Sequence, residues 1–577
     1  MKLRTLLFAT LVCPLALVAG QGQSKSVPTT AASDIPHLRK QGTATQLIVD
    51  GKPFLALAGE LHNNSATSLE YMKPLWPKIV ESKLNTVLAG VSWAQIEPEE
   101  GKFDFSVLDG VIRDARSHNL RLILIWFASW KNGLSSYPPD WVKKDFQRFP
   151  RIQIKGGKTI ELLSTLSDAN RDADAHAFAA LMRHVKEVDS QQQTVIMIQV
   201  ENEVGVLLDS RDRSAAANQA FDGPVPKELM DYLQQHRDAL VPEFRDVWKG
   251  AGFKTSGTWE QVFGKGRPEN FEIPVRVDSP PYKQADLDSW RQIRWPADEI
   301  FMAWHYARYV NAVAEAGKKE YNIPMYVNAW LQQPNFPWPG VYPSGGPEPQ
   351  VHDIWRAGAP SIDILAPDLY LQYFAEVCAR FTRSGNPLFI PETGAGAEGA
   401  AKVLYAFGHH DAIGFSPFGV DGGRAPDDNL IGSYDLISQL APLIVEHQGK
   451  GTMTAVLLNQ NDPPQKVRLG NHTIEATFQF ASHPGAPATR QPMPPAAAIF
   501  IATGPDEYYV AGKGLSLTFS PNTPGPEIDG LGTVEEGVFV NGRWVPGRRL
   551  AGDETIQGQT VSLWNKGIQR VTLYRYH

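Results

Sequence analysis

Cysteine is almost absent from this chain of 577 residues, which contains only Cys13 and Cys378. Cys13 lies in an apolar N-terminal run that we expect to be removed, so the thiol of Cys378 would remain alone. A single thiol cannot form an internal disulfide, and it excludes a zinc site built from cysteines. The stability of the protein must therefore come from the size of its core, which a chain of this length can provide.

An excess of charge of one sign is also lacking. The chain has 55 Lys and Arg against 62 Asp and Glu, a net charge of −7, and the two signs are interspersed. We therefore expect no basic face for nucleic acid or anionic lipid. Because 42% of the residues are hydrophobic, the composition is that of an ordinary globular protein rather than a disordered chain.

The longest apolar run near the N-terminus is too short to cross a membrane. It covers residues 6–18, basic residues precede it and small residues follow it, which is the pattern of a secretory signal peptide. We expect a signal peptide over residues 1–20 and a polar linker over residues 21–45. The expected location is the periplasm or the outside of a bacterial cell.

Apolar strands alternate with helical segments over residues 46–445. Eight segments are apolar along most of their length: 54–57, 85–91, 120–127, 194–200, 324–328, 362–366, 387–390 and 412–415. Strands of this kind are buried on both faces, and eight of them predict an α/β fold of the (β/α)8 TIM-barrel type. A doubly wound open sheet is the rival, but it usually has fewer strands. A long irregular insertion over residues 205–296 is expected to wall the pocket.

The sequence pattern changes after residue 445. Short alternating strands follow, with turns rich in proline and glycine and with little helix. We expect a separate β-sandwich domain over residues 446–577.

Two predicted barrel strands end in glutamate. The fourth strand leads into Glu201-Asn202-Glu203, and the seventh leads into Glu392. Strands four and seven lie nearly opposite each other, and the active sites of barrels lie where the strands end. Two carboxyls about 5 Å apart are the arrangement of a retaining glycosidase, with one as nucleophile and the other as acid/base. A single glutamate could be a salt-bridge residue, but the pair favours catalysis.

Several segments around these strands resemble glycoside hydrolase family 35, the β-galactosidases. They are Gly59-Glu60-Leu61-His62, Asn85-Thr86-Val87, the Trp-x-x-x-Glu-Pro-x-x-Gly-x-Phe-Asp-Phe string at 93–105, and 199–203. The resemblance implies that Glu203 is the acid/base and Glu392 the nucleophile. It also implies that Asn202 binds the sugar hydroxyl next to the reacting carbon.

The chain departs from the family pattern at two places. The family usually carries His-Tyr after strand one, where this chain has His62-Asn63, and a galactose-binding carboxylate after strand three, where it reads Ala-Ser-Trp-Lys-Asn at 128–132. Lys131 and Asn132 are candidates to replace that carboxylate, although a loop lysine is often only solvated. Flat aromatic faces suit the apolar face of a sugar, although a buried Trp is commonly core packing. The expected substrate-binding residues are Glu60, Asn63, Trp130, Lys131, Asn132, Asn202, Asn328, Trp330 and Tyr370, with Asp368 as a further lining candidate.

A dinucleotide-binding interpretation is weaker. Residues 394–399 match G-x-G-x-x-G after a strand, but Glu392 would lie two residues before the phosphates and would repel them. Zinc-protease, P-loop and serine-hydrolase motifs are absent from the sequence. We therefore expect neither a metal nor a cofactor.

Together these patterns predict a retaining exo-β-galactosidase that removes terminal β-galactose from plant cell-wall oligosaccharides, with xyloglucan side chains as the best single candidate. One alternative is another retaining exo-glycosidase of the same clan with a different sugar specificity. The other is a non-catalytic carbohydrate-binding barrel, in which Glu203 and Glu392 need not face one pocket. The linkage and the oligomeric state remain open.

Overall fold

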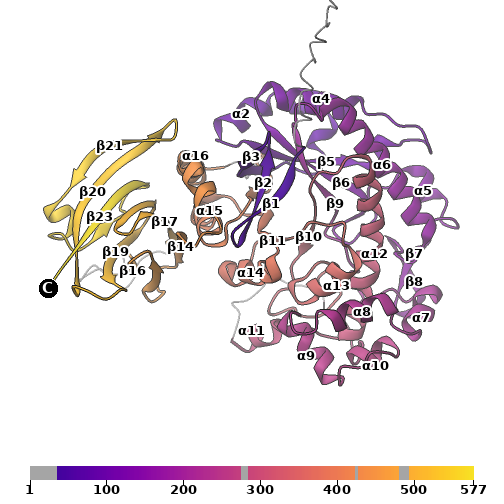
Figure 1. Ribbon diagram of the computed structural model, residues 1–577. Coiled ribbons are helices and arrows are strands. Elements are labelled where there is room, and N and C mark those ends of the chain that lie inside the picture. The colour runs from indigo at the N-terminus through magenta and orange to yellow at the C-terminus, as the bar shows by residue number, and fades with distance from the viewer. Residues whose placement is uncertain (1–34, 275–283, 423–425, 480–492) are drawn as a thin grey trace, which may run out of the picture.

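The computed structural model describes residues 35–274, 284–422, 426–479 and 493–577. It contains a closed barrel of eight parallel strands, which confirms the predicted fold (Figure 1). The barrel strands are β4 (Ala56–Glu60), β5 (Thr86–Ser92), β6 (Arg121–Lys131), β9 (Val195–Asn202), β10 (Met325–Trp330), β11 (Ile364–Leu369), β12 (Phe389–Thr393) and β13 (Gly414–Pro417). Pairing of β13 with β4 closes the barrel.

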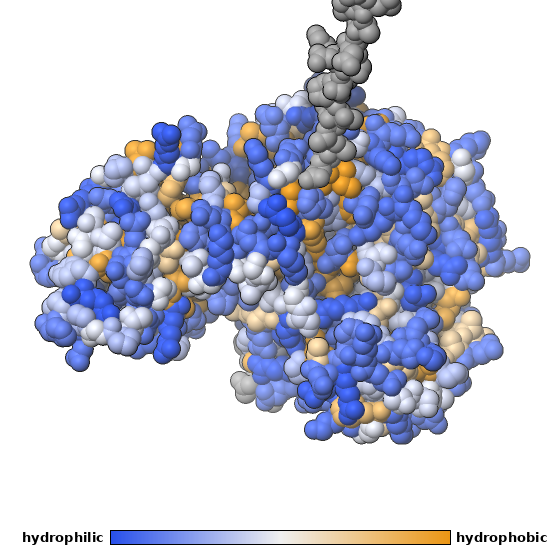
Figure 2. Space-filling model, in the orientation of Figure 1, coloured by the Kyte–Doolittle hydropathy of each residue, from blue (hydrophilic) through white to orange (hydrophobic). Residues whose placement is uncertain are grey.

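Helices surround the barrel, and their outer faces are mostly hydrophilic in the view of Figure 2. They include α1 (Leu69–Met72), α2 (Leu75–Glu81), α3 (Trp93–Ile96), α4 (Ser106–Ser117), α5 (Asp140–Lys144), α6 (Asp168–Asp189), α12 (Pro296–Glu320), α13 (His352–Gly358), α14 (Phe374–Phe381), α15 (Gly396–His410) and α16 (Asp428–His447). α6 begins after Ser167, whose hydroxyl caps the Asn170 N–H. Among the described residues, no helix combines the length and the apolar character that a membrane span requires.

A small antiparallel sheet covers one end of the barrel. It consists of β1 (His37–Gln41), β2 (Ala44–Val49) and β3 (Lys52–Phe54). Leu47 and Val49 of β2 belong to the same buried cluster as the residues inside the barrel, and the Asp50 N–H donates to Gln193 just before β9. The sheet therefore closes the end where the barrel strands begin, and it leaves their carboxyl ends open.

This sheet corrects part of the domain prediction. Residues 37–41 form β1, and residues 44 and 45 begin β2, which pairs with β1 across a turn, so this stretch is not a linker. The expected signal peptide, residues 1–20, and residues 21–34 of the linker lie outside the described residues.

The expectation of an irregular insertion at 205–296 is also wrong. This region contains α7 (Ala215–Asp222), α8 (Lys227–Gln235), α9 (Pro242–Gly250), α10 (Trp259–Phe263) and α11 (Gln284–Trp290). Apolar residues recur at helical spacing in these short segments, as Phe244 and Trp248 do on α9, and they are buried. A further hairpin of β7 (Arg151–Ile154) and β8 (Lys158–Leu163) precedes α6.

The C-terminal part forms two antiparallel sheets that share one buried core, as the β-sandwich prediction requires. The six-stranded sheet has the order β14 (Met453–Leu458), β17 (Ala496–Gly504), β18 (Glu507–Lys513), β23 (Gly567–Tyr576), β20 (Ile528–Val540) and β21 (Arg543–Leu550). The four-stranded sheet has the order β15 (Gln465–Leu469), β16 (His472–Phe478), β19 (Leu515–Pro521) and β22 (Val561–Ser562). Ile499 and Ile501 on the other face of the larger sheet join the barrel's core, and α15 and α16 lie between the two domains (Figure 1).

Candidate active site

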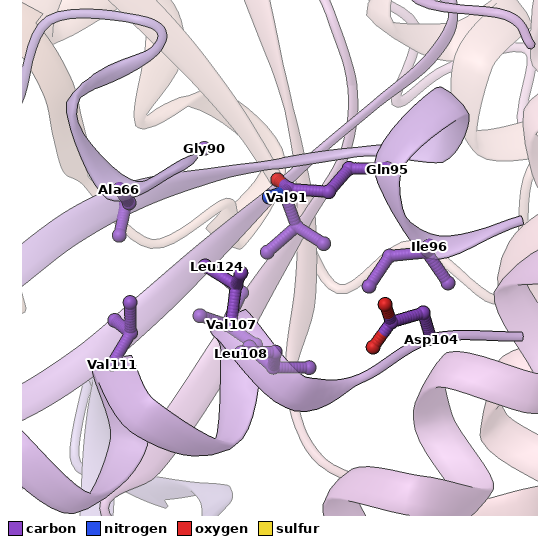
Figure 3. Close-up of a pocket in the computed structure, with 11 residues that line it drawn as sticks. Ala66, Gly90, Val91, Gln95, Ile96, Asp104, Val107, Leu108, Val111 and Leu124 are labelled. Carbon is purple, nitrogen blue, oxygen red and sulfur yellow. The ribbon is translucent and has the colours of Figure 1, made fainter. Parts of the chain in front are cut away.

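A pocket of about 260 Å³ lies at the carboxyl ends of the barrel strands. It is lined by Asn132, Glu203, Trp330, Leu331, Gln333, Asp368, Tyr370, Leu371 and Glu392. The lining combines carboxyls, amides and two aromatic side chains, which suits a ligand with many hydroxyl groups. A second cavity, between β5 and α4, measures only about 20 Å³ and is lined mostly by apolar side chains (Figure 3). That cavity has room for about one water molecule and is a gap in the packing.

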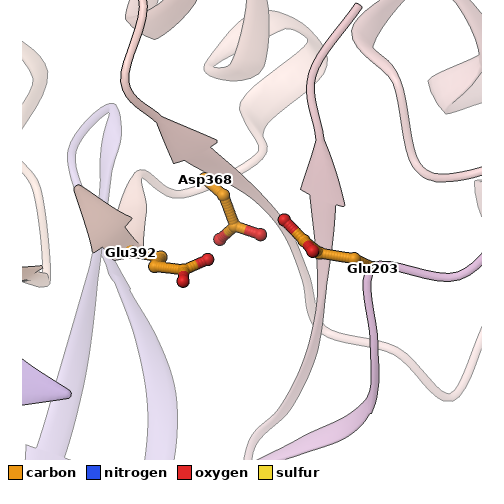
Figure 4. Close-up of side chains that lie close together, drawn as sticks. All are labelled: Glu203, Asp368 and Glu392. Carbon is orange, nitrogen blue, oxygen red and sulfur yellow. The ribbon is translucent and has the colours of Figure 1, made fainter. Parts of the chain in front are cut away.

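Three carboxyl groups meet in the pocket. One oxygen each of Glu203, Asp368 and Glu392 lies within 4.8 Å of the other two, and Figure 4 shows the three groups pointing toward one another. Asp368 and Glu392 are paired in register on the neighbouring strands β11 and β12, so their side chains leave the sheet on the same side. The two glutamates that the sequence singled out therefore face one pocket.

The backbone turns sharply where β9 ends. Glu201 and Glu203 have φ angles of 63° and 45°, in the left-handed region that residues other than glycine rarely adopt. The Glu201 carboxylate accepts hydrogen bonds from the backbone N–H groups of Ser129 (3.3 Å) and Trp130 (2.7 Å) in β6. These bonds hold the turn against β6, and the turn directs Glu203 into the pocket. Strained backbone of this kind is common at functional sites.

Two amide side chains fix the polar groups around the glutamates. Asn328 on β10 accepts a hydrogen bond from the Glu203 N–H at 2.9 Å, and its Nδ2 donates to Asp368 Oδ2 at 2.7 Å. Lys131 Nζ donates to Asn202 Oδ1 at 2.9 Å. All five side chains are buried, so the arrangement is protected from competing water.

Burial dominates the electrostatics of the pocket. It raises the pKa of Glu203, which the nearby Lys131 ammonium lowers in part. Burial and the charges of Glu392 and Glu203 raise the pKa of Asp368 well above its ordinary value. Glu60 behaves in the same way, with burial first and Glu392 second. So many carboxyls cannot all be ionised at neutral pH, and some of them hold protons.

The structure brings several predicted residues to the pocket. Asn132, Trp330 and Tyr370 line it directly. Glu60 is buried behind it, close enough for its charge to act on Asp368 and Tyr370. Asn63, half-buried at the end of β4, has a side-chain oxygen without a hydrogen-bond partner and does not line the pocket. The substrate-binding roles of all these residues remain predictions.

Trp130 does not lie where a sugar platform would be. Its side chain is fully buried, its indole N–H donates to the Leu163 carbonyl at 3.0 Å, and its ring packs on Tyr306 and Tyr309 of α12. The reason is that β6 continues to Lys131, four residues past Phe127, where we expected it to end. Trp130 therefore belongs to the wall between the barrel and its helices.

None of the described residues of the insertion, 205–274 and 284–296, lines the pocket, contrary to expectation. The segment after β10, which carries Leu331 and Gln333, lines the pocket, and the insertion supports this segment. The Leu208 N–H donates to the Gly340 carbonyl at 2.9 Å, and Val206 and Ser344 exchange backbone hydrogen bonds at 2.9 and 3.0 Å. A buried carboxylate, Glu348, fixes the start of the same loop by accepting from the Gln332 N–H at 2.7 Å.

Sequence reasoning missed the loop residues Leu331, Gln333 and Leu371, because no periodic pattern marks a loop as pocket wall. It also missed Tyr326, whose buried hydroxyl has no hydrogen-bond partner among the described residues. The charges of Glu60, Asp368 and Glu392 add to burial in raising the pKa of Tyr326, so its hydroxyl lies near these carboxyls. Alternation along β10 places Tyr326 on the same face as Asn328, which was the available signal.

The three carboxyls are also the one group in the described part of the chain that could hold a metal ion. Carboxylate oxygens are ligands for hard cations such as Ca²⁺ or Mg²⁺. The expectation of a site without metal or cofactor stays a prediction.

Two family models match parts of the chain. One is described as a β-galactosidase family (Glyco_hydro_42) and matches residues 70–264, and the other is a domain of unknown function (DUF5597) that matches residues 430–562. A curated β-galactosidase from Xanthomonas manihotis is 32% identical over 216 residues, or 36% of this chain. The match spans about a third, 32%, of the length of that relative.

Two solved β-galactosidase structures are also similar. The enzyme from Bacillus circulans sp. alkalophilus has a TM-score of 0.42 and 14% identity, over 68% of this chain and 57% of that chain. The enzyme from the psychrophilic Marinomonas ef1 has a TM-score of 0.41 and 13% identity, over 69% of this chain and 60% of that chain.

By sequence, part of the chain is therefore similar to β-galactosidases, and the matches do not single out family 35. The β-galactosidase model covers Glu203 but ends well before Glu392. The second glutamate is therefore assigned by its position at the end of β12 and by the geometry of the pocket.

We predict that Trp130 and Trp330 respond differently to truncation. Trp130→Ala should lower the free energy of unfolding by about 3–5 kcal/mol, because it empties a buried site. Trp330→Ala should leave stability nearly unchanged and weaken the binding of a β-galactoside up to about tenfold. Thermal unfolding and calorimetric binding measure the two effects. An unchanged melting temperature for the Trp130 variant, with weakened binding, would contradict its placement in the core.

Proposed function

We propose that this chain is a retaining exo-β-galactosidase with Glu392 as nucleophile and Glu203 as general acid/base. The observation that carries the proposal is the approach of these two buried glutamates, from opposite sides of the barrel, to within 4.8 Å in one pocket. A non-catalytic sugar-binding barrel would have no need to keep both.

The proposed reaction has two displacements. Glu392 attacks the anomeric carbon while Glu203 donates its proton to the glycosidic oxygen, which leaves with the rest of the substrate. Glu203 then takes a proton from water, and that water cleaves the bond between Glu392 and the sugar, so the β configuration is kept. Carboxyls in inverting enzymes are about 6.5–9.5 Å apart to leave room for a water molecule, and the closer approach here favours retention.

The surroundings of Glu203 fit the role of acid. Burial raises its pKa and so keeps a proton on it, while Lys131 limits that rise and helps Glu203 to act as a base in the second step. The Asn328 side chain bonds both to the backbone N–H of Glu203 and to the Asp368 carboxyl, so it holds these two residues in place. The acid therefore has a fixed orientation as well as a proton.

We further propose that the chain belongs with family 35, is exported by its N-terminal signal, and acts on plant cell-wall oligosaccharides such as galactosylated xyloglucan. The resemblance of residues 59–62, 93–105 and 199–203 supports the family. The absence of a carboxylate in the stretch 128–132 supports a pocket with altered specificity, and the small volume of the pocket suits one terminal sugar.

The first test separates the two glutamates. Glu392→Ala should reduce turnover roughly 10⁴-fold or more, and a 2-fluoro galactoside should label Glu392 in the wild type. Glu203→Ala should reduce turnover of natural glycosides roughly 10²–10⁴-fold but spare substrates with good leaving groups, because these need no acid. Added azide should then yield the β-galactosyl azide from the Glu203 variant and the α-azide from the Glu392 variant.

Glu398→Gln, which alters an exposed carboxyl on α15, is the matched control and should keep full activity. Labelling of a different carboxylate would refute the nucleophile, and equal losses on both classes of substrate would refute the acid.

The second test concerns pH. Because the Lys131 ammonium lowers the pKa of Glu203, Lys131→Met should raise that pKa and move the basic limb of the kcat/KM profile to higher pH. Lys131→Arg keeps the charge and should leave the limb near its wild-type position. A limb that stays in place or moves to lower pH in the methionine variant would show that Lys131 does not act on the acid.

The third test concerns the substrate. The catalytic efficiency should be higher on galactosylated xyloglucan oligosaccharides than on lactose or β-1,4-galactan. Initial rates of galactose release on the three substrates measure this. A clear preference for lactose or for galactan would overturn the proposed substrate and leave the roles of the glutamates intact.

A further inference from the structure

Asp368 is a third carboxyl in the pocket, and the proposed reaction does not use it. It lies on β11, next to Glu392 in register and close to Glu203. Its side chain lines the pocket although only 4% of the residue is exposed to solvent. A third buried acidic group beside the two proposed catalytic carboxyls adds electrostatic repulsion and desolvation cost to the site. A function in substrate binding would explain why the site contains it.

The two oxygens of Asp368 have different surroundings. Oδ2 accepts a hydrogen bond from Asn328 Nδ2 at 2.7 Å, which fixes the orientation of the carboxyl group. Oδ1 is buried and accepts no hydrogen bond from an amide, hydroxyl or amine of the described residues, and the hydrogen-bonding neighbour of the carboxyl besides Asn328 is the Glu203 carboxyl. Leaving a buried acceptor without a donor costs about 1–3 kcal/mol, and more for a charged group. A ligand hydroxyl in the pocket would remove this cost.

Asp368 Oδ1 is one of two carboxyl oxygens in this region that accept no hydrogen bond from an amide, hydroxyl or amine of the described residues. Glu60 Oε1 is also buried without a hydrogen-bond donor. The ammonium of Lys131 donates to Asn202, and the Asn328 amide donates to Asp368 itself. A sugar brings several O–H donors, so a neutral sugar complements these acceptors. A sugar that carries a carboxylate would instead meet the negative field of the acidic cluster.

The Ser129 hydroxyl on β6 is not available as an alternative hydrogen-bonding group for the sugar. Its hydroxyl is buried and donates to Asp174 Oδ2 of α6 at 2.5 Å, which directs it away from the pocket. Asp368 of β11 instead supplies a carboxyl of fixed orientation at the pocket wall.

We propose that Asp368 is a specificity-determining residue, which accepts a hydrogen bond from one hydroxyl of the sugar in the pocket and selects neutral sugars over uronic acids. This inference rests on the proposed galactosidase activity. It assigns to Asp368 a binding role that is separate from the roles of Glu203 and Glu392.

The test is a cycle of enzyme and substrate changes. Wild type and Asp368→Ala are assayed on an aryl β-galactoside and on its 3-, 4- and 6-deoxy analogues. The variant should lose about 10- to 100-fold in kcat/KM on the parent substrate, the range expected for a hydrogen bond to a charged group. For one deoxy analogue, kcat/KM of the wild type should fall by a similar factor relative to the parent substrate. The kcat/KM of Asp368→Ala should fall little further on that analogue, because the variant already lacks the hydrogen bond that the missing hydroxyl would make.

Two further measurements separate this role from a structural one. Labelling by the 2-fluoro galactoside should still reach Glu392 in Asp368→Ala, and Glu398→Gln should match the wild type on every analogue. Asp368→Asn should narrow the preference for the aryl galactoside over the aryl galacturonide, because it removes one ionisable group from the cluster that shares the negative charge, without changing the shape of the side chain. Additive losses on all three analogues, or an unchanged kcat/KM, would overturn the proposal.

An inactive wild type would refute the proposed activity and not this inference. The same analogues are then compared by calorimetric binding to the wild type and to Asp368→Ala. Additive binding losses for every analogue would overturn the role of Asp368, and a non-additive loss for one of them would support it.

Discussion

The burial of several carboxyl groups at one end of the barrel is the constraint on which the site depends. Glu60, Glu203, Asp368 and Glu392 share a space with one nearby ammonium, that of Lys131. Burying these four carboxyls together is possible only if some of them are protonated and hydrogen-bond donors stabilise the charge of the others. This would suit an acid/base catalyst, because the same electrostatic repulsion that destabilises the ligand-free site also keeps a proton on the acid.

Rigid supports make this arrangement possible. The left-handed residues Glu201 and Glu203 are held by the hydrogen bonds of the Glu201 carboxylate to the backbone of β6 and by that of the Glu203 N–H to Asn328. Glu201 is itself buried against Asp174, and burial followed by that charge raises its pKa well above the ordinary value. Two carboxyls outside the pocket thus hold the turn that brings Glu203 inside it.

The sequence predicted the eight barrel strands because strands buried on both faces are mostly apolar, as residues 195–198 illustrate. It also located both glutamates, since barrel chemistry lies at strand ends. It misplaced Trp130 because the apolar run was taken to stop at Phe127. Trp126, Ala128 and Trp130 all pack outward in the structure, and this alternation continues the strand. Asp368 was only a weak candidate, because its importance depends on neighbours from other strands.

The C-terminal domain illustrates what local patterns leave out. Its strands were visible as alternating segments, but α16 and the docking of the larger sheet were not. That docking depends on close approach: a Cβ built on Gly408 of α15 would lie 2.7 Å from the Ala455 side chain of β14, closer than real contacts allow. Glycine at this position lets a helix of the barrel lie directly on the sheet. Since α15 begins three residues after β12, the domain contacts the helix that follows the strand of Glu392. A β-domain far from the pocket in sequence can therefore influence the rigidity of the site.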